Sequence, residues 1–357
     1  MSNIRFAFVG LGGIFAGSHA PAVKHMPELE VVGLCDIDEG KFQRATSLFP
    51  NARTYTDYLE MFKTEKPDAV ALCLPNYLHS IVAVAALEMG IHVLCEKPDA
   101  VNVEEALKMK AASEKSGKLL MVMRNNRFLE SSQLLKKYME EGQMGDIYAG
   151  RCGWIRRRGI PGRGGWFTTK AQSGGGPLID LGVHMIDLTI WLMGNPRPVA
   201  VSGAAFNKFA NNEVDTDPSV AMFGNTVKGG TFDVEDLVMG FIRFDNGAVL
   251  QIEFSWASNI AAEKNFVELR GDKAGFTWEN GNINLYSQMG STLTDVAPHC
   301  RNAIPGHQGY YRNFVNVLLG REEPNFVPQQ GVDMIRILCA IYRSAETGRE
   351  VLLEEQA

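Results

Sequence analysis

A short apolar run that breaks into glycines, RFAFVGLGGIFAG at residues 5–17, limits most strongly what this chain can fold into. The run predicts a strand that ends in a turn and leads into a helix. In such a turn Gly10 would make the tight bend, and Gly12 would let the backbone approach a phosphate. Free N–H groups and the dipole at the start of the helix favour bound negative charge. The segment therefore predicts a site for the pyrophosphate of a dinucleotide.

The third position of this G-x-G-x-x-G/A pattern departs from the usual small residue. Phe15 stands there, and Ala16 and Gly17 follow it. A small residue at this position allows close packing of the helix on the strand. An ordinary glycine-rich turn between a strand and a helix therefore stays open as an alternative.

Asp36 supports the dinucleotide interpretation. It follows the apolar run 29–35, at the place where a carboxylate would accept both ribose hydroxyls of an adenosine. Ile37 comes next in place of an arginine, so nothing obvious would offset a 2′-phosphate, and NAD is favoured over NADP as the cofactor. The alternative is that Asp36 caps the helix that begins with Asp38 and Glu39.

Length and composition limit the classes of protein to which the chain can belong. With 357 residues it is long enough for two domains, and 45% hydrophobic and 21% charged residues are typical of a water-soluble globular protein. A formal net charge of -6 argues against a nucleic-acid partner, because phosphate binding needs a basic face. No apolar stretch approaches the roughly 18 residues of a membrane span, and no basic-plus-apolar leader is seen. We therefore expect no membrane partner and a cytoplasmic location.

Missing motifs exclude several common classes of enzyme. The six cysteines are scattered without a C-x-x-C pair, and we expect them to be reduced thiols. The H-E-x-x-H, G-x-S-x-G and Walker-type patterns are absent, which excludes the commonest zinc proteases, serine hydrolases and phosphate-loop proteins. Of the common classes of enzyme reaction, redox chemistry is the one that these absences leave.

Short apolar runs alternate with helical segments in the first part of the chain. Each run is too short for a helix and apolar enough to be covered on both faces, as the strands of a parallel sheet are. Helix start signals at Asp57 and Asn102 agree with this pattern. It predicts a doubly wound α/β domain over residues 1–123. The runs are 6–9, 31–35, 69–74, 92–95 and 119–123.

From residue 124 onward the pattern changes to helices followed by a region rich in strand signals. It predicts an α+β domain over residues 124–357, whose open, mostly antiparallel sheet has one face under helices. An open sheet of this kind commonly dimerises through its free face. The predicted elements are the helices 129–141, 178–193, 310–319 and 331–346, and a hairpin of strands 237–244 and 248–256 joined at Asp245-Asn246-Gly247.

Two polar segments follow buried strands, at the edge where open α/β sheets bind ligands. The first is Pro75-Asn76-Tyr77-Leu78-His79, and the second is Glu96-Lys97-Pro98. A lysine buried beside a cofactor can donate to a substrate hydroxyl or exchange a proton with it, and Pro98 makes a cis bond possible. The alternative is that Glu96 and Lys97 merely pair at the surface.

A third polar segment lies in the predicted helix 178–193. Asp180, His184 and Asp187 would project from one face of that helix. An acid one turn from a histidine can fix the tautomer of the imidazole and keep it able to accept a proton. A structural histidine and an Asp/His/Asp metal site are the alternatives, and the metal site lacks a matching second cluster. We predict no bound metal.

The glycine- and arginine-rich loop 156–176 precedes this helix and would be able to reach the substrate. Arginine there would bind carboxylate or phosphate, and Trp166 would stack on a sugar ring. Solvated arginines, or arginines that pair subunits, are the alternative. The cluster comprises Arg151, Arg156, Arg157, Arg158 and Arg163.

Five motifs in this order resemble those of the glucose–fructose oxidoreductase / inositol dehydrogenase / rhizopine catabolism (Gfo/Idh/MocA) family. They are G-x-G, the Asp after strand two, P-N-x-x-H, E-K-P and G-G-G-x-x-x-D-x-G-x-H. The resemblance spans nearly the whole chain. It implies a Rossmann domain, a second α/β domain whose open sheet is used in dimers or tetramers, a tightly held nicotinamide cofactor, and sugar or cyclic-polyol substrates.

The same resemblance implies roles for individual residues. Lys97 would contact the reacting hydroxyl and the nicotinamide, His184 would accept the proton, and Asp180 would accompany His184 at the substrate. Lys97 and His184 would then meet over the nicotinamide. The predicted cofactor site is Gly10, Gly12, Gly13, Ile14, Asp36, Pro75, Asn76, His79, Glu96 and Lys97, and the predicted substrate site is Lys97, Arg127, Arg157, Trp166, Asp180 and His184.

These residues together predict an NAD-dependent oxidoreductase that oxidises a secondary or anomeric hydroxyl of a sugar or inositol-like polyol and also runs in reverse. One alternative is a non-catalytic regulator that senses NAD or a sugar, although the presence of Lys97, Asp180 and His184 together argues against it. Another is a glycosidase that uses NAD only transiently.

Overall fold

The computed structural model describes residues 3–210, 224, 226–301 and 303–353. The chain forms two compact units, the first of residues 1–125 with 305–335 and the second of residues 126–304 with 336–357. The segment 305–335, which we expected in the second domain, packs with the first unit. Helix α9 (Gly306–Leu318) contacts α1 (Ala20–Val23) there, and Tyr310 donates a hydrogen bond to the carbonyl of Val122.

The first unit is built on a six-stranded parallel sheet in the order β3-β2-β1-β4-β5-β6. This is the strand order of a Rossmann fold, so the predicted doubly wound sheet is confirmed. Every residue of β4 is buried, as expected for a strand covered on both faces. The strands are β1 (Ile4–Val9), β2 (Leu29–Cys35), β3 (Arg53–Tyr55), β4 (Ala69–Leu72), β5 (His92–Cys95) and β6 (Leu120–Val122).

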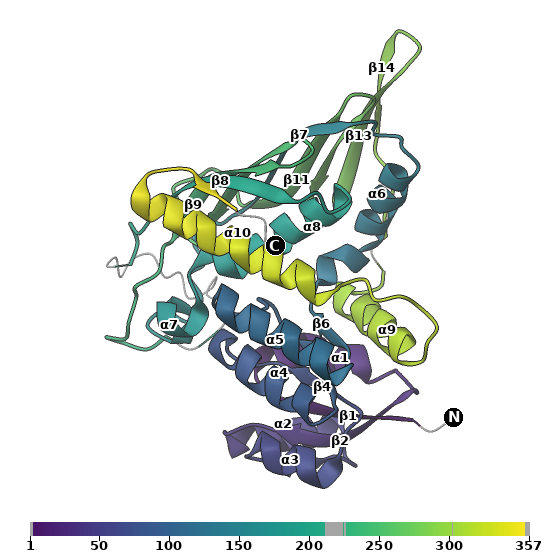
Figure 1. Cartoon of the computed structure of the whole chain (residues 1–357), viewed down its shortest axis with the longest axis vertical. Helices are drawn as coiled ribbons and strands as arrows, with labels where there is room; N and C mark the ends of the chain where they lie inside the picture. Colours follow the sequence, from purple (N-terminus) through teal and green to yellow (C-terminus); the bar gives the residue numbers. More distant parts are fainter. Residues whose placement is uncertain (1–2, 211–223, 225, 302, 354–357) are drawn as a thin grey trace. The chain divides into compact units, whose positions relative to one another are not determined.

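Helices connect these strands, and α4 and α5 lie side by side (Figure 1). Two helix starts agree with the sequence, because Asp57 accepts hydrogen bonds from the first turn of α3 and Asn102 accepts one from the first turn of α5. The helical segments are η1 (Phe15–His19), α1, η2 (Glu39–Lys41), α2 (Phe42–Leu48), α3 (Tyr58–Glu65), η3 (Asn76–Leu78), α4 (His79–Glu88), α5 (Val103–Ser116) and α9.

The second unit is built on a nine-stranded sheet in the order β14-β13-β12-β11-β7-β10-β9-β8-β15. Strands β7 and β10 pair in parallel, and the other pairs are antiparallel, so the predicted mostly antiparallel sheet is confirmed. The strands are β7 (Ile147–Ile155), β8 (Pro198–Phe206), β9 (Leu237–Phe244), β10 (Val249–Ser255), β11 (Lys264–Gly271), β12 (Gly275–Glu279), β13 (Asn282–Met289), β14 (Thr292–Val296) and β15 (Val351–Leu352).

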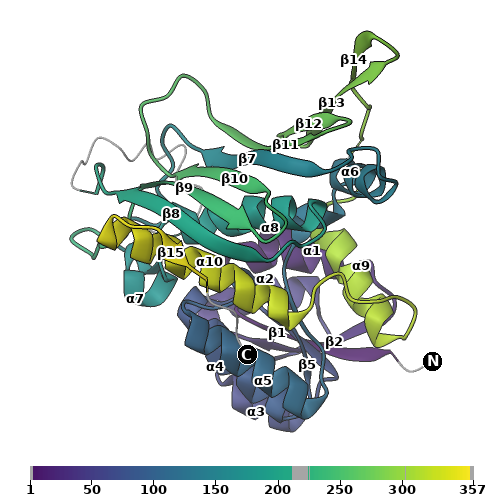
Figure 2. The same ribbon diagram turned by 45° about the horizontal axis from the view of Figure 1, so that its top comes forward.

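One face of this sheet packs against α8 (Val183–Leu192), which contacts β7 and β11 (Figure 2). In β10 Leu250, Ile252 and Phe254 are fully buried, whereas Gln251 between them is exposed, because successive side chains of a strand point to opposite faces of the sheet. The remaining helical segments are η4 (Asn125–Phe128), α6 (Glu130–Glu140), η5 (Trp166–Thr168), α7 (Lys170–Ser173), η6 (Leu178–Gly182) and α10 (Pro328–Thr347). Among the described residues, no helix combines the length and the apolar character that crossing a bilayer requires.

Candidate functional site

The glycine turn after β1 has the geometry that a dinucleotide requires. Gly10 has a φ angle of +90°, and a Cβ added to it would lie 2.2 Å from the carbonyl oxygen of Cys73, so only glycine fits. A Cβ on Gly12 or Gly13 would meet no atom within 4 Å, so the backbone here faces open space. The turn is followed by helical residues whose N-terminal N–H groups favour an anion. These residues fit the pyrophosphate of a nicotinamide dinucleotide.

Phe15 stands at the third position of the G-x-G-x-x-G/A pattern, where a small residue is usual. Its ring is fully buried and lies 5.0 Å from that of Phe8 and 6.4 Å from that of Phe49, measured between centroids. The helix adopts a π turn over Phe15–His19 rather than an α turn. Single π turns occur often at functional sites. The aromatic side chain therefore completes the core of the first unit, and the glycine turn before it is preserved.

Asp36 ends β2 as a buried carboxylate with several partners. It accepts hydrogen bonds from the backbone of Leu11 at 2.7 Å and of Asp38 at 2.9 Å. The ammonium of Lys41 lies 3.0 Å and 3.1 Å from its two oxygens. Asp38, not Asp36, caps the short helix η2, so the capping alternative for Asp36 is wrong. Lys41 thus places a cation beside Asp36, where we expected none. We had considered only the residue directly after Asp36, whereas Lys41 stands five residues after it.

His79 ties the turn that begins at Pro75 to the E-K-P segment. Its imidazole is fully buried, with Nδ1 2.7 Å from the carbonyl oxygen of Pro98 and Nε2 2.9 Å from that of Leu74. Burial lowers the pKa of His79. Asn76 beside it is also buried, and the Lys97–Pro98 bond is cis. The two polar segments at the carboxyl edge of the sheet are thus held together.

Glu96 is buried, so the alternative of a surface pair with Lys97 is wrong for this carboxylate. One oxygen accepts the backbone N–H of Lys97 at 3.0 Å, and the other lies 2.7 Å from Nε2 of His19 and 3.4 Å from Nε2 of His307. Neither histidine carried a signal in the sequence, because each comes from a distant segment. The nearest clue in the sequence was the i, i+4 spacing of His307 and Tyr311, which places both side chains on the same face of one helix; the hydroxyl of Tyr311 contacts His19.

In the second unit a buried glutamate holds the start of the segment that carries Asp180. Glu235 accepts the backbone N–H of Gly176 at 3.0 Å and of Leu178 at 3.2 Å, and the hydroxyl of Tyr342 at 2.8 Å. A Cβ on Gly176 would lie 2.1 Å from the carbonyl oxygen of Glu235, which explains the glycine. Burial raises the pKa of Glu235. The carboxylate thus satisfies N–H groups that have no partner within a helix.

Asp180 and His184 stand out because they are the two partly exposed residues between 175 and 189. Asp180 lies in the π turn η6 and accepts the indole N–H of Trp256 at 3.0 Å. His184 follows in α8, with its ring 5.8 Å from that of Trp154. The residues around them, from Gly175 to Thr189, are buried, so these two polar groups are the ones that this segment leaves accessible to a substrate.

Asp187, the third member of the predicted polar face, is paired with Arg127. The guanidinium donates from Nε at 2.8 Å and from Nη2 at 2.6 Å to the two carboxylate oxygens. Both side chains are buried, at 1% exposure for Arg127 and 6% for Asp187. This bidentate pair gives Arg127 a structural explanation, whereas we had expected it at the substrate.

The arginine-rich loop makes contacts within the second unit. The backbone of Arg157 donates to Glu263 at 2.8 Å, and its side chain is exposed. Trp166 is half-buried and stacks on Phe167 with ring centroids 3.8 Å apart. Arg163 donates to the carbonyl groups of Phe209 and Ala210. The role of Arg157 and Trp166 in binding substrate stays a prediction.

Comparisons with known proteins agree with this geometry. The family model GFO_IDH_MocA, described as "Oxidoreductase family, NAD-binding Rossmann fold", matches residues 4–124, and its C-terminal partner, described as "Oxidoreductase family, C-terminal alpha/beta domain", matches residues 136–353.

Three similar proteins match this chain over nearly their whole length. D-glucoside 3-dehydrogenase of Escherichia coli K12 is 34% identical, covering 99% of this chain and 98% of that protein. The scyllo-inositol 2-dehydrogenase (NADP(+)) IolW of Bacillus subtilis 168 is 26% identical, covering 96% and 95%. The structure of the WlbA dehydrogenase of Bordetella pertussis in complex with NADH and UDP-GlcNAcA is 25% identical with a TM-score of 0.80, covering 99% of each chain. The chain therefore belongs to the Gfo/Idh/MocA oxidoreductase family.

Proposed function

We propose that this protein is an NAD-dependent dehydrogenase that oxidises a secondary hydroxyl of a sugar or glycoside to a ketone, or an anomeric hydroxyl to a lactone. The observation that carries the proposal is the accessibility of Asp180 and His184 on an otherwise buried helical segment. The glycine turn at Gly10 and the carboxylate of Asp36 support the choice of cofactor.

When bound, the nicotinamide supplies the hydride acceptor. Lys97 holds the substrate oxygen by donating a hydrogen bond to it, and His184 takes the hydroxyl proton as general base. Asp180, itself held by the indole of Trp256, orients His184 and the substrate. Trp166 and Arg157 would bind the sugar ring or an anionic group on it.

Because the E. coli relative is named D-glucoside 3-dehydrogenase, a glucoside is a better candidate substrate for this chain than an inositol. The test is NADH absorbance at saturating NAD⁺ over a panel of glucosides, free aldoses, sugar acids and inositols. We expect net NADH with at least one glucoside. Glycoside cleavage without net NADH would instead indicate a redox-assisted glycosidase, and binding without turnover would indicate a regulator.

We propose NAD rather than NADP as the preferred cofactor, because the Asp36 carboxylate would repel a 2′-phosphate. Replacing Asp36 with serine should lower the ratio of kcat/KM for NAD⁺ to that for NADP⁺ by at least about tenfold, since like charges placed side by side cost several kcal/mol. The freed Lys41 ammonium would add attraction for the phosphate. Steady-state kinetics with both cofactors measure the ratio.

Asp57→Ser is the matched control for this experiment, because serine also caps helices and Asp57 caps α3. The control should leave the ratio near that of the wild type. An Asp36→Ser variant with an unchanged ratio would show that another residue selects the cofactor.

We propose a homodimer or homotetramer formed through the face of the second unit's sheet that faces away from α8. Tyr148, Met239 and Tyr286 are exposed strand residues that support this assignment, since large exposed side chains are common at interfaces. Light scattering after size exclusion gives the mass that tests it. The cytoplasmic location stays a prediction.

A further inference from the structure

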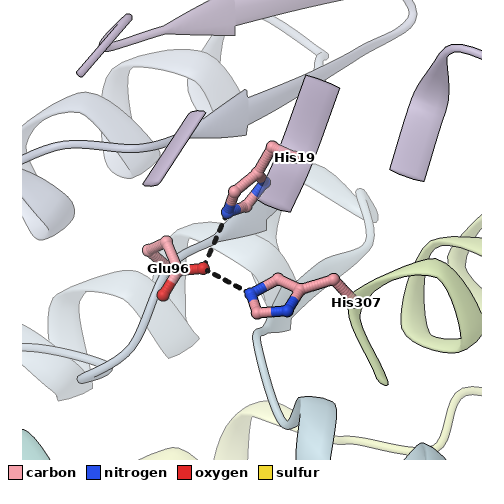
Figure 3. Close-up of side chains that lie close together, drawn as sticks. All are labelled: His19, Glu96 and His307. Atoms are coloured by element: carbon pink, nitrogen blue, oxygen red, sulfur yellow. Dashed lines mark hydrogen bonds and ion pairs between the residues drawn. The ribbon is translucent and has the colours of Figure 1, made fainter. Parts of the chain in front are cut away.

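The buried carboxylate of Glu96 joins three segments that are far apart in the sequence (Figure 3). His19 ends the π turn η1 that follows the glycine turn, Glu96 follows β5, and His307 lies in α9. Both imidazoles point their Nε2 atoms at the same oxygen, Oε1, at 2.7 Å and 3.4 Å. All three residues belong to the first unit.

The direction of the hydrogen bonds follows from the burial of the groups. Nδ1 of His19 lies 2.7 Å from the hydroxyl of Tyr311. Burial lowers the pKa of His19 and raises that of Tyr311 well above its ordinary value, so both stay neutral. A neutral imidazole has one donor, so the phenol donates to Nδ1 and the Nε2–H of His19 donates to Glu96.

The same contacts keep Glu96 charged. Burial alone would raise its pKa, but the hydrogen bonds with His19 and His307 hold it well below the ordinary value. The second oxygen, Oε2, accepts the backbone N–H of Lys97 at 3.0 Å. A single carboxylate therefore connects two imidazoles to the backbone of the residue that we propose holds the substrate oxygen.

We propose that His19 and His307 are positioning residues that act through Glu96 to fix the Lys97 backbone. The proposal rests on the proposed function of Lys97. It gives α9, which follows β14 of the second unit in the sequence, a role at the Lys97 segment of the first unit. A small displacement of a group that holds the reacting atom lowers turnover strongly. A fixed backbone at Lys97 should therefore raise kcat.

A metal ion held by the same three side chains is the competing interpretation, because their ligand atoms lie within 4.8 Å of one another. Zinc ligands about 2.0 to 2.1 Å from the metal stand roughly 3.3 Å apart in a tetrahedron. The separation of 2.7 Å between His19 and Glu96 is instead that of a hydrogen bond. The 3.4 Å between His307 and Glu96 is compatible with both interpretations, so the His19–Glu96 distance is what favours a hydrogen-bonded network.

The test compares His307→Leu with His307→Gln, whose amide can still donate to Glu96. We expect His307→Leu to lower kcat roughly tenfold or more while the Kd for NAD⁺ and the melting temperature change little. Hydrogen exchange at the Lys97 amide should become faster. His307→Gln should restore most of kcat and the protection, and His25→Leu, at an exposed histidine of the same unit, should behave as the wild type.

Combination with Lys97→Met separates this proposal from the proposed function. If His307 acts through Lys97, His307→Leu lowers kcat no further in the Lys97→Met background. An equal further loss, or unchanged exchange at the Lys97 amide, would overturn the proposal. So would one equivalent of a transition metal in the purified protein whose removal by a chelator lowers kcat. A wild-type kcat for Lys97→Met alone would refute the proposed function, whereas the exchange experiment would still decide whether His307 fixes that backbone.

Discussion

Replacing Lys97 with methionine lowers kcat for sugar oxidation by about a hundredfold or more, as loss of a positioned acid–base group does. Methionine keeps the length and apolar stem of the side chain but cannot donate to the substrate oxygen. The glycine turn and Asp36 are unchanged, so the Kd for NAD⁺ and the melting temperature should stay near those of the wild type. Stopped-flow NADH formation together with a fluorescence titration of the nucleotide measures both quantities.

Lys63→Met is the matched control, because Lys63 lies exposed on α3 of the same unit. It should leave kcat and cofactor binding at wild-type values. Unchanged turnover in Lys97→Met would remove Lys97 from the mechanism.

Replacing Arg127 with methionine lowers the free energy of unfolding of the second unit by about 3–5 kcal/mol, because it leaves the buried carboxylate of Asp187 without its partner. The two side chains are 1% and 6% exposed, so water cannot replace the lost hydrogen bonds. All five tryptophans, Trp154, Trp166, Trp191, Trp256 and Trp278, belong to this unit. Tryptophan fluorescence in a urea titration therefore reports its unfolding.

Arg151→Met provides the comparison, since Arg151 pairs with Glu268 where the two side chains are 44% and 21% exposed, far more than those of Arg127 and Asp187. Exposed pairs contribute at most about 1 kcal/mol. Removing both buried partners in Arg127→Met/Asp187→Leu should recover part of the loss. If the Arg127→Met protein had normal stability and a raised KM, the result would show that Arg127 binds substrate, as the sequence analysis predicted.

The fold of the first unit was predictable because its signals are local. Short apolar runs, the glycine at position 10 and the caps at Asp57 and Asn102 each act within a few residues, and the structure has them where they were expected. The hairpin at Asn246-Gly247 was predictable for the same reason, since Gly247 adopts the positive φ angle that such a turn requires.

Long-range packing accounts for what the sequence did not reveal. Nothing local marks the segment 305–335 as part of the first unit, or brings His307 to Glu96. The polar face of Asp180, His184 and Asp187 assumed α-helical spacing, but the chain forms a π turn at Leu178–Gly182 and Asp187 pairs with Arg127. Lys41 escaped notice because its contact with Asp36 depends on the shape of the turn between them.

The central claim is that Lys97 and His184 serve the same substrate hydroxyl, and a double-mutant cycle on kcat tests it most directly. Groups that act as a unit in one step are strongly non-additive. With the best substrate of the panel we expect Lys97→Met/His184→Ala to be about as slow as the slower single variant. A double variant whose loss in kcat equals the product of the two single losses would show that the two residues act independently and would contradict the claim.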